Sequence, residues 1–309
     1  MSRRRNGRDI HGILLLDKPA GYSSSQAVQA VRRLLDARKA GHTGSLDPFA
    51  TGMLPICLGA ASKTAGFMLE ASKTYLATAR MGQATTTGDI EGEVVREMPV
   101  PEWPVARIEA AFERFRGPIE QVPPMYSALK HEGQPLYKLA REGKEVPRKA
   151  RAVTIHLLEL IRWERPLLTL KVECSKGTYI RTLAEDIAAA LDNCAHLQSL
   201  RRLSVEPFHD ARMVGLDELE KRVAAGKLKD VLLAPDAAIA DWPRVGLTAE
   251  QADRFAHGNP VDAALDAAPP GLARVYGPQD RLLGIGELRA EGRVHPKRLM
   301  SVTRDETSE

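Results

Sequence analysis

Residues 41–59 read GHTGSLDPFATGMLPICLG, and this stretch organises the rest of the chain. Glycines punctuate its first part and favour turns, and Pro48 removes a backbone donor and biases Asp47 away from helical geometry. The apolar run over 53–58 then predicts a buried strand that anchors the loop to a core. The sequence therefore predicts that Asp47 is held on a stiff loop directly before a buried strand. Asp before Pro is also common in ordinary turns, so a turn-forming role stays open on spacing alone.

The length and composition indicate a globular protein with one large and one small domain. A chain of 309 residues is long for a single core. Its hydrophobic content of 43% and charged content of 27% are ordinary for soluble proteins. No apolar run approaches the about 18 residues of a membrane span, and the basic N-terminus lacks the apolar region of a secretory signal. We expect a cytoplasmic protein that does not associate with membranes.

Cysteine and histidine usage argues against a metal centre. The three cysteines show no CxxC pairing, which fits buried thiols in a reducing compartment. The eight histidines are scattered, with no HExxH motif and no Cys/His cluster. Gly-rich cofactor motifs are also missing. The sequence therefore predicts neither a bound metal nor a cofactor.

The net charge of +4 is unevenly distributed. Residues 241–309 carry 9 Lys and Arg against 11 Asp and Glu, which leaves 35 against 29 in residues 1–240. Two segments are clearly basic: residues 1–40 hold nine bases and three acids, and residues 128–151 hold seven bases and three acids. Such clusters indicate a polyanionic partner that is bound through its phosphates. A solvated, Lys- and Arg-rich surface is the alternative that charge alone leaves open.

The pattern of elements predicts a mixed sheet. Residues 11–17 read as a strand, followed by a helix that Ser23, Ser24 or Ser25 can cap. Further strands are expected at 74–81, 152–164, 167–174 and 197–206, and helices near 61–70, 105–115 and 179–191. Because strands and helices do not alternate regularly, an α+β fold with a mixed, largely antiparallel central sheet fits better than a Rossmann core.

Two segments stand apart from this pattern. Residues 117–150 are rich in Gly, Pro and Lys and read as a long insertion, and such insertions are usually functional or disordered. Prolines and a charge shift at 234–246 mark a domain boundary. The remainder, 241–309, contains one expected helix at 248–257 and short strands such as 281–290, so it reads as a small β-rich module.

Five stretches resemble a single family. They are GILLLDKPAGYSSSQAV (12–28), the opening stretch, KTYLATARMGQATTTGDIEGEV (73–94), VPPMYSALKHEGQPLYKLAREG (122–143) and CSKGTYIRTLAEDIA (174–188). In this order they are similar to the TruB family of tRNA pseudouridine synthases. The resemblance implies a pseudouridine synthase catalytic domain over 1–240, with an RNA-clamping insertion at about 117–150, and a PUA-like RNA-binding domain over 241–309. It further implies a monomer that isomerises uridine 55 in the T loop of tRNA without a cofactor or metal.

The resemblance also implies roles for particular residues. The catalytic residues would be Asp47 as the nucleophile, Tyr75 as the acceptor of the carbon-5 proton, and Arg181, whose charge would keep Asp47 ionised and lower its pKa. The substrate-binding residues would be His42, Tyr179, Leu200, Lys18, Arg201 and Arg202. Within that set, His42 would brace the loop, Tyr179 would stack on the uracil, and Leu200 would contact its edge through the backbone. Arg201 and Arg202 would lie near phosphates, and Lys18 with Pro19 would support the active loop.

The implied reaction requires base flipping, because a stacked uridine cannot be reached. Stacking on an aromatic side chain contributes about 1–3 kcal/mol and offsets much of the flipping cost.

Three other functions remain open. A non-catalytic RNA-binding or RNA-chaperone protein could keep the same fold. A uridine glycosidase would release uracil, but such enzymes usually use paired carboxylates, and no second acid beside Asp47 is evident in a motif. Guide-RNA-dependent dyskerin relatives are a nearer alternative, although the chain lacks long lysine-rich tails, which favours a stand-alone enzyme.

Overall fold

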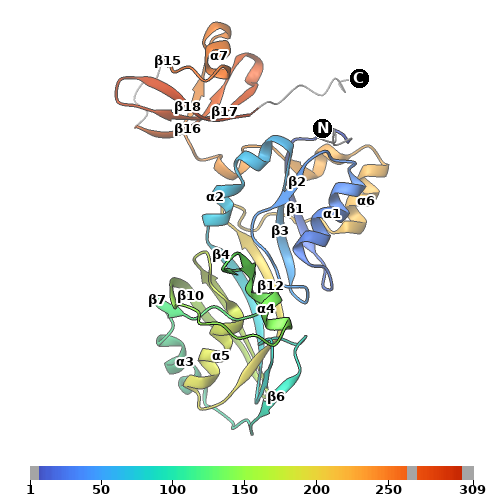
Figure 1. Cartoon of the computed structure of the whole chain (residues 1–309), viewed down its shortest axis with the longest axis vertical. Coiled ribbons are helices and arrows are strands. Elements are labelled where there is room, and N and C mark those ends of the chain that lie inside the picture. The colour runs from blue at the N-terminus through green and yellow to red at the C-terminus, as the bar shows by residue number, and fades with distance from the viewer. Residues whose placement is uncertain (1–6, 263–269, 301–309) are drawn as a thin grey trace.

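The computed structural model describes residues 7–262 and 270–300. These residues form an elongated molecule in which a small C-terminal sheet sits above a long central sheet (Figure 1). The basic residues before position 7, and parts of the predicted C-terminal module, lie outside the described residues.

The central sheet has nine strands and is mixed. Its spatial order is β13 (Leu232–Leu233), β1 (Gly12–Lys18), β3 (Thr51–Leu58), β12 (Ala195–Val205), β4 (Lys73–Met81), β11 (Leu167–Cys174), β10 (Arg151–Glu164) and β7 (Gly117–Gln121), and β2 (Ala40–His42) pairs with β3 off this path. Strand β12 runs parallel to β3, and every other pairing in this sheet is antiparallel. The predicted α+β fold with a largely antiparallel sheet is confirmed.

Helices and short strands complete the large domain. The helices are α1 (Ser24–Leu34), η1 (Gly59–Lys63), α2 (Ala65–Glu70), α3 (Val105–Glu113), α4 (Leu136–Arg141), α5 (Ile180–Ala190), α6 (Leu216–Ala224), η2 (Leu228–Val231) and η3 (Ala237–Ile239). Two small hairpins are formed by β5 (Gln83–Thr85) with β6 (Val94–Glu97), and by β8 (Lys130–His131) with β9 (Gln134–Pro135). Helix α6 had no counterpart among the predicted elements, and the helix predicted at 61–70 is divided at Thr64 into η1 and α2.

Helix α1 shows how local sequence sets an element. Ser23 is its N-cap: its hydroxyl accepts the Gln26 N–H, and the Gln26 side chain accepts the Ser23 N–H, which completes a capping box. Ala27 and Val31 are fully buried on the face that packs against β1 and β3. The predicted cap and helix are therefore confirmed, with Ser23 as the capping residue.

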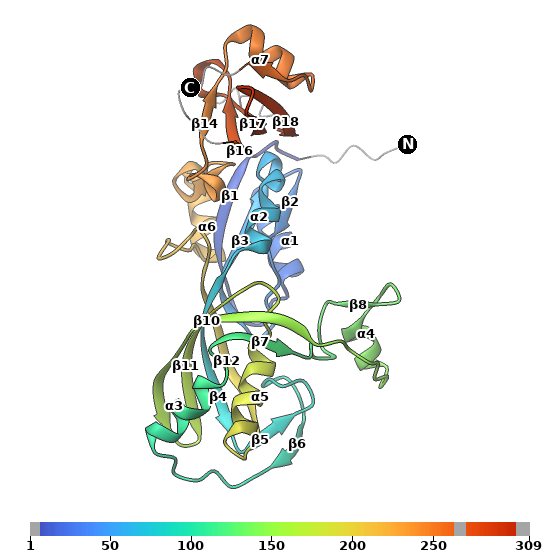
Figure 2. The same ribbon diagram turned by 90° about the vertical axis from the view of Figure 1, so that its left-hand side faces the viewer.

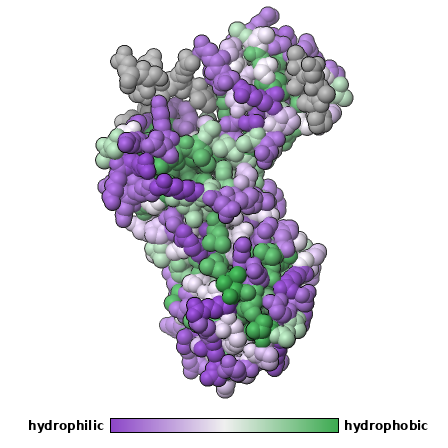
Figure 3. Space-filling view, turned by 180° about the vertical axis from the view of Figure 1, so that it is seen from behind, coloured by the Kyte–Doolittle hydropathy of each residue, from purple (hydrophilic) through white to green (hydrophobic). Residues whose placement is uncertain are grey.

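The sheet is covered unequally. Around β1 and β3, α1 and α6 pack on one face and α2 on the other. Around β4, β10 and β11, the helices α3 and α5 cover one face and form the main core with Ala77, Leu170 and Phe112. Side chains on the other face of β4 and β11 stay partly exposed. Figure 3 shows the molecule from behind, and there hydrophobic residues form an exposed band over the half of the molecule that lies away from the C-terminal domain.

The segment predicted as an insertion begins as part of the sheet. Residues 117–121 form β7, which pairs antiparallel with β10 over Arg151–Ile155. The chain leaves the sheet only after Gln121. Residues 122–150 then carry β8, β9 and α4 and project sideways from the domain (Figure 2).

The C-terminal domain has a sheet of its own. Its order is β14 (Arg244–Gly246), β16 (Gly271–Tyr276), β17 (Leu282–Leu288), β18 (Arg293–Leu299) and β15 (Val261–Asp262), accompanied by η4 (Pro278–Asp280) and α7 (Ala249–Ala256). Phe255, Val275 and Val294 are fully buried within it. The predicted β-rich character of this part is confirmed for the residues described.

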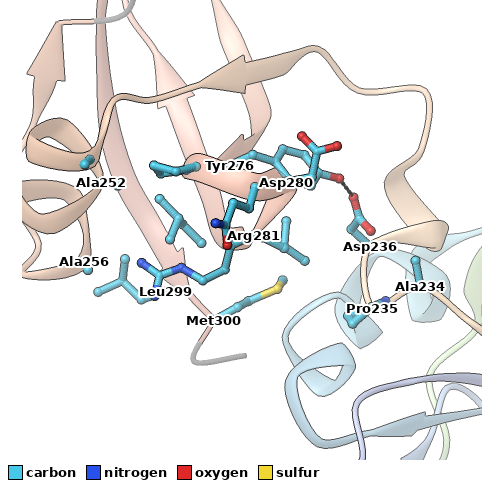
Figure 4. A pocket seen from close by; sticks show the side chains of 15 residues that line it. Ala234, Pro235, Asp236, Ala252, Ala256, Tyr276, Asp280, Arg281, Leu299 and Met300 are labelled. Carbon is cyan, nitrogen blue, oxygen red and sulfur yellow. Dashed lines mark hydrogen bonds between the residues drawn. The ribbon is translucent and has the colours of Figure 1, made fainter. Parts of the chain in front are cut away.

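The two domains meet through aromatic and polar contacts. Phe67 of α2 meets Trp242 edge-on, with ring centroids 4.6 Å apart. Tyr276 donates a hydrogen bond to Asp236, and Arg274 lies 3.3 Å from the same carboxylate. A pocket of 1120 Å³ opens at this junction (Figure 4), and none of the predicted site residues lines it.

Within the two described ranges, no helix is long and apolar enough to cross a membrane.

Candidate active site

The loop that carries Asp47 is fastened on both sides of that residue. We call residues 43–50, between β2 and β3, the catalytic loop. Before Asp47, the Leu46 N–H donates to the Ser24 hydroxyl at 2.8 Å, and that hydroxyl donates to the Leu46 carbonyl at 3.1 Å. After Asp47, the Pro48 carbonyl accepts from the Gly21 N–H at 2.9 Å and from the Lys18 ammonium at 3.2 Å. Asp47 is therefore held between two tethered neighbours, as the stiff loop predicted from sequence requires.

Asp47 forms an ion pair with Arg181. The Arg181 Nε lies 3.1 Å from Asp47 Oδ2. The Asp47 side chain keeps 38% of its surface accessible, whereas Arg181, on the first turn of α5, keeps 5%. Residues that are 134 positions apart in the chain are thus brought together, with the carboxylate reachable from outside and the guanidinium behind it.

Arg181 is fixed by three further acceptors. Its terminal nitrogens donate to the carbonyls of Thr87 and Tyr126, each at 2.8 Å. One of them also lies 3.4 Å from Asp89 Oδ2. A pocket of 600 Å³ lies beside these groups, between the 86–88 loop, α5 and residues of the 122–150 segment. Each of the three guanidinium nitrogens therefore has at least one acceptor, and these contacts fix the orientation of Arg181 relative to Asp47.

Asp89 is the residue of the candidate site that sequence reasoning missed. It is 3% exposed, and its Oδ1 accepts the Thr87 hydroxyl at 2.6 Å and the Glu91 N–H at 3.0 Å. The sequence showed no second acid in a motif beside Asp47, and the structure places Asp89 on the far side of the shared Arg181 guanidinium. The signal was present in the stretch 73–94, where a Thr two residues before an Asp is typical of a local turn. Because its oxygens are occupied, Asp89 orients Arg181 and is closed to substrate.

The net pKa shift of Asp47 is opposite to the one expected. Burial raises the pKa of the Asp47 carboxyl, and the Arg181 guanidinium opposes this only in part. The charge of Asp89 raises the Asp47 pKa further. The lowering contribution that was expected of Arg181 is present, but burial outweighs it, so the net shift of the Asp47 pKa is upward.

This raised pKa predicts an acid limb in the pH–rate profile. The resemblance implies that Asp47 is the nucleophile, which must be ionised, so the rate should fall as the pH drops through a pKa above the ordinary Asp value of 3.8. The measurement is kcat/KM on tRNA from pH 4.5 to 8, with circular dichroism at each pH to show that the protein stays folded. A rate that is flat over the whole folded range would contradict the prediction.

Two tyrosines complete the site. Tyr75 of β4 is 9% exposed, and burial raises the pKa of its phenol while the charge of Arg202 opposes the rise. Tyr179 is the N-cap residue of α5, and burial raises the pKa of its phenol. The charge of Asp47 acts on the pKa of both phenols, which places them around the same carboxylate.

Sequence comparisons identify the family of the chain. Residues 32–180 match the TruB family pseudouridylate synthase N-terminal domain, residues 181–240 match the tRNA pseudouridylate synthase B C-terminal domain, and residues 243–300 match the pseudouridine synthase II TruB C-terminal domain. The chain is 48% identical over 311 residues to tRNA pseudouridine synthase B of Serratia proteamaculans (strain 568), covering 97% of this chain and 98% of that protein. The chain belongs to the TruB family. It is also 51% identical over 302 residues to tRNA pseudouridine synthase B of Pseudomonas putida (strain F1), covering 96% and 98%.

Solved structures share the fold of this TruB-family protein. A Cbf5–Nop10–Gar1 complex contains a chain that superposes with a TM-score of 0.71 at 24% identity, covering 94% of this chain and 84% of that one. An H/ACA RNP bound to a substrate RNA containing 2′-deoxyuridine gives a TM-score of 0.71 at 21% identity, covering 98% and 92%. At these identities the likeness concerns the fold alone.

Lys18 of the TruB-family protein lies beneath the catalytic loop. Its side chain is fully buried, and besides Pro48 its ammonium donates to the carbonyls of Pro19 at 2.9 Å and Tyr22 at 2.6 Å. Burial lowers the pKa of Lys18 to about 8. Lys18 was grouped with the substrate-binding residues, but an ammonium enclosed by three carbonyls supports the loop and does not reach substrate.

The two arginines of β12 have different environments. Arg201 is 38% exposed and bonds both oxygens of Asp17, at 3.0 and 2.8 Å. Arg202 is 1% exposed, so the expectation that it contacts phosphate was wrong. Leu200 contributes its side chain to the main core at 6% exposure.

His42 ends β2 with its ring partly buried. Burial and the nearby Arg202 charge lower its pKa, so the imidazole is neutral at physiological pH. Its Nδ1 is buried without a hydrogen-bond partner. A neutral ring beside the catalytic loop fits the bracing role that the resemblance implies.

Gly52 explains why β12 can approach the end of the catalytic loop. Its φ is +98°, and a Cβ at this position would lie 2.2 Å from the Arg202 carbonyl oxygen. Gly52 and Arg202 are partners in the parallel pairing of β3 and β12. Any side chain at position 52 would push β12 away from the loop.

Among the residues that the structure describes, no cluster of three or more His, Cys, Asp or Glu side chains has the geometry to hold a metal ion. The three cysteines are buried and unpaired, as predicted.

Proposed function

We propose that this TruB-family protein converts uridine 55 in the T loop of tRNA to pseudouridine, with Asp47 as the nucleophile acting on a flipped-out nucleotide. The observation that carries the proposal is the accessible Asp47 carboxylate 3.1 Å from the buried Arg181, with Tyr75 and Tyr179 beside it. The relatives named tRNA pseudouridine synthase B, at 48–51% identity over nearly the whole chain, support tRNA as the substrate.

The proposed steps follow from the positions of these groups. The uridine leaves its stack and lies against the aromatic rings, which compensate for part of the unstacking cost. Asp47 then attacks carbon 1′ of the ribose, so that a bond from carbon 1′ to the carboxylate oxygen forms as the bond to uracil nitrogen 1 breaks, and the base turns. Carbon 5 next bonds to carbon 1′ and displaces the Asp47 carboxylate, which is thereby regenerated. Tyr75, as the phenolate, accepts the carbon-5 proton, and nitrogen 1 gains a proton from water.

The geometry favours isomerisation over hydrolysis. A hydrolase with paired carboxylates needs both acids open to substrate and water. Asp89 is instead closed by Arg181, Thr87 and Glu91. We further propose that the protein acts as a monomer in the cytoplasm, since its three buried, unpaired cysteines fit a reducing compartment.

We propose domain roles in keeping with the substrate. Residues 1–240 would be the catalytic domain, the segment at about 117–150 would clamp the tRNA arm, and residues 241–309 would be a PUA-like RNA-binding domain. The clamp role rests on the bases that project from residues 122–150, of which Lys130, Lys138 and Lys149 are exposed. Lysines at this position would bind phosphates without reading sequence.

The clamp predicts a change in the salt dependence of binding. Replacing Lys130, Lys138 and Lys149 together by Ala should weaken tRNA binding and make the plot of log K against log salt shallower by about 0.7–0.9 for each phosphate that is no longer neutralised. Fluorescence anisotropy from 50 to 300 mM KCl measures this. Replacing the equally exposed Lys221, Lys227 and Lys229 by Ala is the matched control. Equal effects of the two triple variants would contradict the clamp.

The proposed function is tested with purified protein and one unmodified tRNA transcript, without any guide RNA. We expect position 55 to give a carbodiimide adduct that survives alkaline treatment, as pseudouridine does, with no other uridine changed, and a transcript with cytidine at that position to stay unmodified. Chromatography of the reaction should detect no free uracil. Binding without conversion would instead favour a non-catalytic RNA-binding protein, release of uracil a glycosidase, and a need for guide RNA a dyskerin-like enzyme.

A further inference from the structure

Arg202 is an unusual residue for the interior of this protein. It is among the largest fully buried side chains, at 1% exposure. Among the described residues, no carboxylate lies within ion-pairing distance of its guanidinium, which instead donates to backbone carbonyls: Nε to Met53 at 2.7 Å, and a terminal nitrogen to Gly44 at 3.1 Å. Burying a cation without a counter-charge is costly, so the position calls for an explanation.

The two carbonyl acceptors lie on either side of the nucleophile. Gly44 precedes Asp47 within the catalytic loop, and Met53 follows the loop on β3. One planar guanidinium therefore joins the beginning of the loop to the strand that leaves it. Ser24 and Lys18 do not make this connection, since they tie the loop to α1 and β1.

The same guanidinium reaches Tyr75. Arg202 and Tyr75 are directly opposite each other in the antiparallel pairing of β12 and β4, and the Arg202 charge acts on the Tyr75 phenol. Cross-strand partners project from the same face of a sheet. The register of the sheet thus places one buried positive charge between the loop of Asp47 and the phenol of Tyr75.

Resting on the proposed function, we infer that Arg202 is a positioning residue that holds both ends of the catalytic loop and prepares Tyr75 to take the carbon-5 proton. In that step Tyr75 acts as the phenolate, having first released its own proton to water. The carbon-5–hydrogen bond breaks, its electron pair stays in the uracil ring, and the proton forms the neutral phenol. The positive charge of Arg202 stabilises the phenolate. The phenolate in turn is a counter-charge for Arg202, which has none while Tyr75 is neutral.

Other groups around Tyr75 do not supply this stabilisation. Asp47 faces the phenol from the catalytic loop, and Cys174 faces it from β11. Burial and both of these groups raise the pKa of Tyr75, and Arg202 is the group that lowers it. Removing the Arg202 charge should therefore move the phenol titration to higher pH.

The test compares Arg202→Met, Arg202→Lys, Tyr75→Phe and the Arg202→Met/Tyr75→Phe double variant in single-turnover reactions with saturating tRNA. We expect Arg202→Met to slow the step by about 10²-fold, in the range of general-base contributions. The Kd for tRNA should stay within twofold of wild type, and the basic inflection of the pH–rate profile should move upward. Arg202→Lys keeps the positive charge but loses the planar guanidinium. It should therefore react more slowly than wild type, while its basic inflection stays close to the wild-type pH. The single-turnover rate of the double variant should lie within threefold of the rate of Tyr75→Phe.

A structural arginine provides the control. Arg116 donates two hydrogen bonds to the Leu158 carbonyl in the same domain, and Arg116→Met should keep the wild-type rate.

A weakened Kd with an unchanged single-turnover rate would overturn the inference in favour of a phosphate contact. Equal slowing by Arg202→Met with and without Tyr75 would also overturn it. If Arg202→Met does not fold, Arg202→Lys and its pH profile decide. A wild-type protein that leaves uridine 55 unmodified would instead refute the proposed function itself.

Discussion

Asp47→Asn is expected to lower the rate of uridine conversion in tRNA by at least about 10⁴-fold, since removing a nucleophile has effects of this size or larger. The amide has nearly the shape of the carboxylate but cannot act as the nucleophile. Arg181 keeps its bonds to Asp89, Thr87 and Tyr126, so the surrounding groups should stay in place. The measurement is tritium release from tRNA labelled at carbon 5 of uridine.

The same substitution should not weaken the fold. Because burial raises the pKa of Asp47, ionising this group is harder in the folded than in the unfolded state. Its negative charge at neutral pH therefore opposes folding, and the opposition disappears as the pH falls through the folded pKa. We expect the Tm of Asp47→Asn at pH 7 to equal or exceed that of the wild type.

The matched control is Asp192→Asn. Asp192 is 87% exposed and pairs with Arg107 on the surface, so its loss should change neither rate nor Tm measurably. Turnover of Asp47→Asn within tenfold of wild type would exclude Asp47 as the nucleophile. A clear fall in its Tm would show that the ion pair with Arg181 stabilises the folded state.

Arg181→Lys is the second substitution with a large expected effect. The guanidinium serves Asp47, Asp89 and the carbonyls of Thr87 and Tyr126 at once, and an ammonium cannot meet acceptors in these directions together. We expect turnover to fall by at least about 10²-fold, as when other preorganised charges are removed from an active site. Because Asp89 would lose its only charged partner among the described residues, stability should fall by up to about 3–5 kcal/mol.

Urea unfolding and single-turnover kinetics measure these two effects separately. Arg107→Lys is the control, because Arg107 is 49% exposed and makes one surface ion pair at 3.1 Å. Its stability should change by less than about 1 kcal/mol. A stable and fully active Arg181→Lys protein would show that the fork geometry is unimportant and that a point charge suffices.

Local features of the fold were predictable from the chain. Ser23 and Gln26 form their capping box from four consecutive residues, and the alternation over 74–81 matches the buried and exposed faces of β4. These features depend on neighbours in sequence, so their physical causes are visible there. Residues 117–121 were misassigned for the opposite reason: β7 is a strand because it pairs with β10, whereas its sequence GPIEQ begins with Gly and Pro, which favour loops.

The candidate site also has features that the sequence reveals and features that only the structure shows. Asp47, Tyr75 and Arg181 were identified through motifs, but motifs could not show that Arg181 also serves Asp89. Nor could they show that Gln121 is 2% exposed and bonds both the N–H and the carbonyl of Tyr179. For Arg201 and Arg202, adjacent residues of one type, the sequence predicted one shared role near phosphate.

The sequence by itself determined the family, the main strands of the central sheet and the choice of Asp47 as the candidate carboxylate, because turn, cap and motif signals act over a few residues. Only the tertiary structure decided the direction of the Asp47 pKa shift, the burial of Lys18 and the separate roles of the two β12 arginines. Those properties depend on desolvation and on charges contributed by distant strands. Their sign follows from which groups the sheet register brings together, and that register is set by pairing across the whole domain.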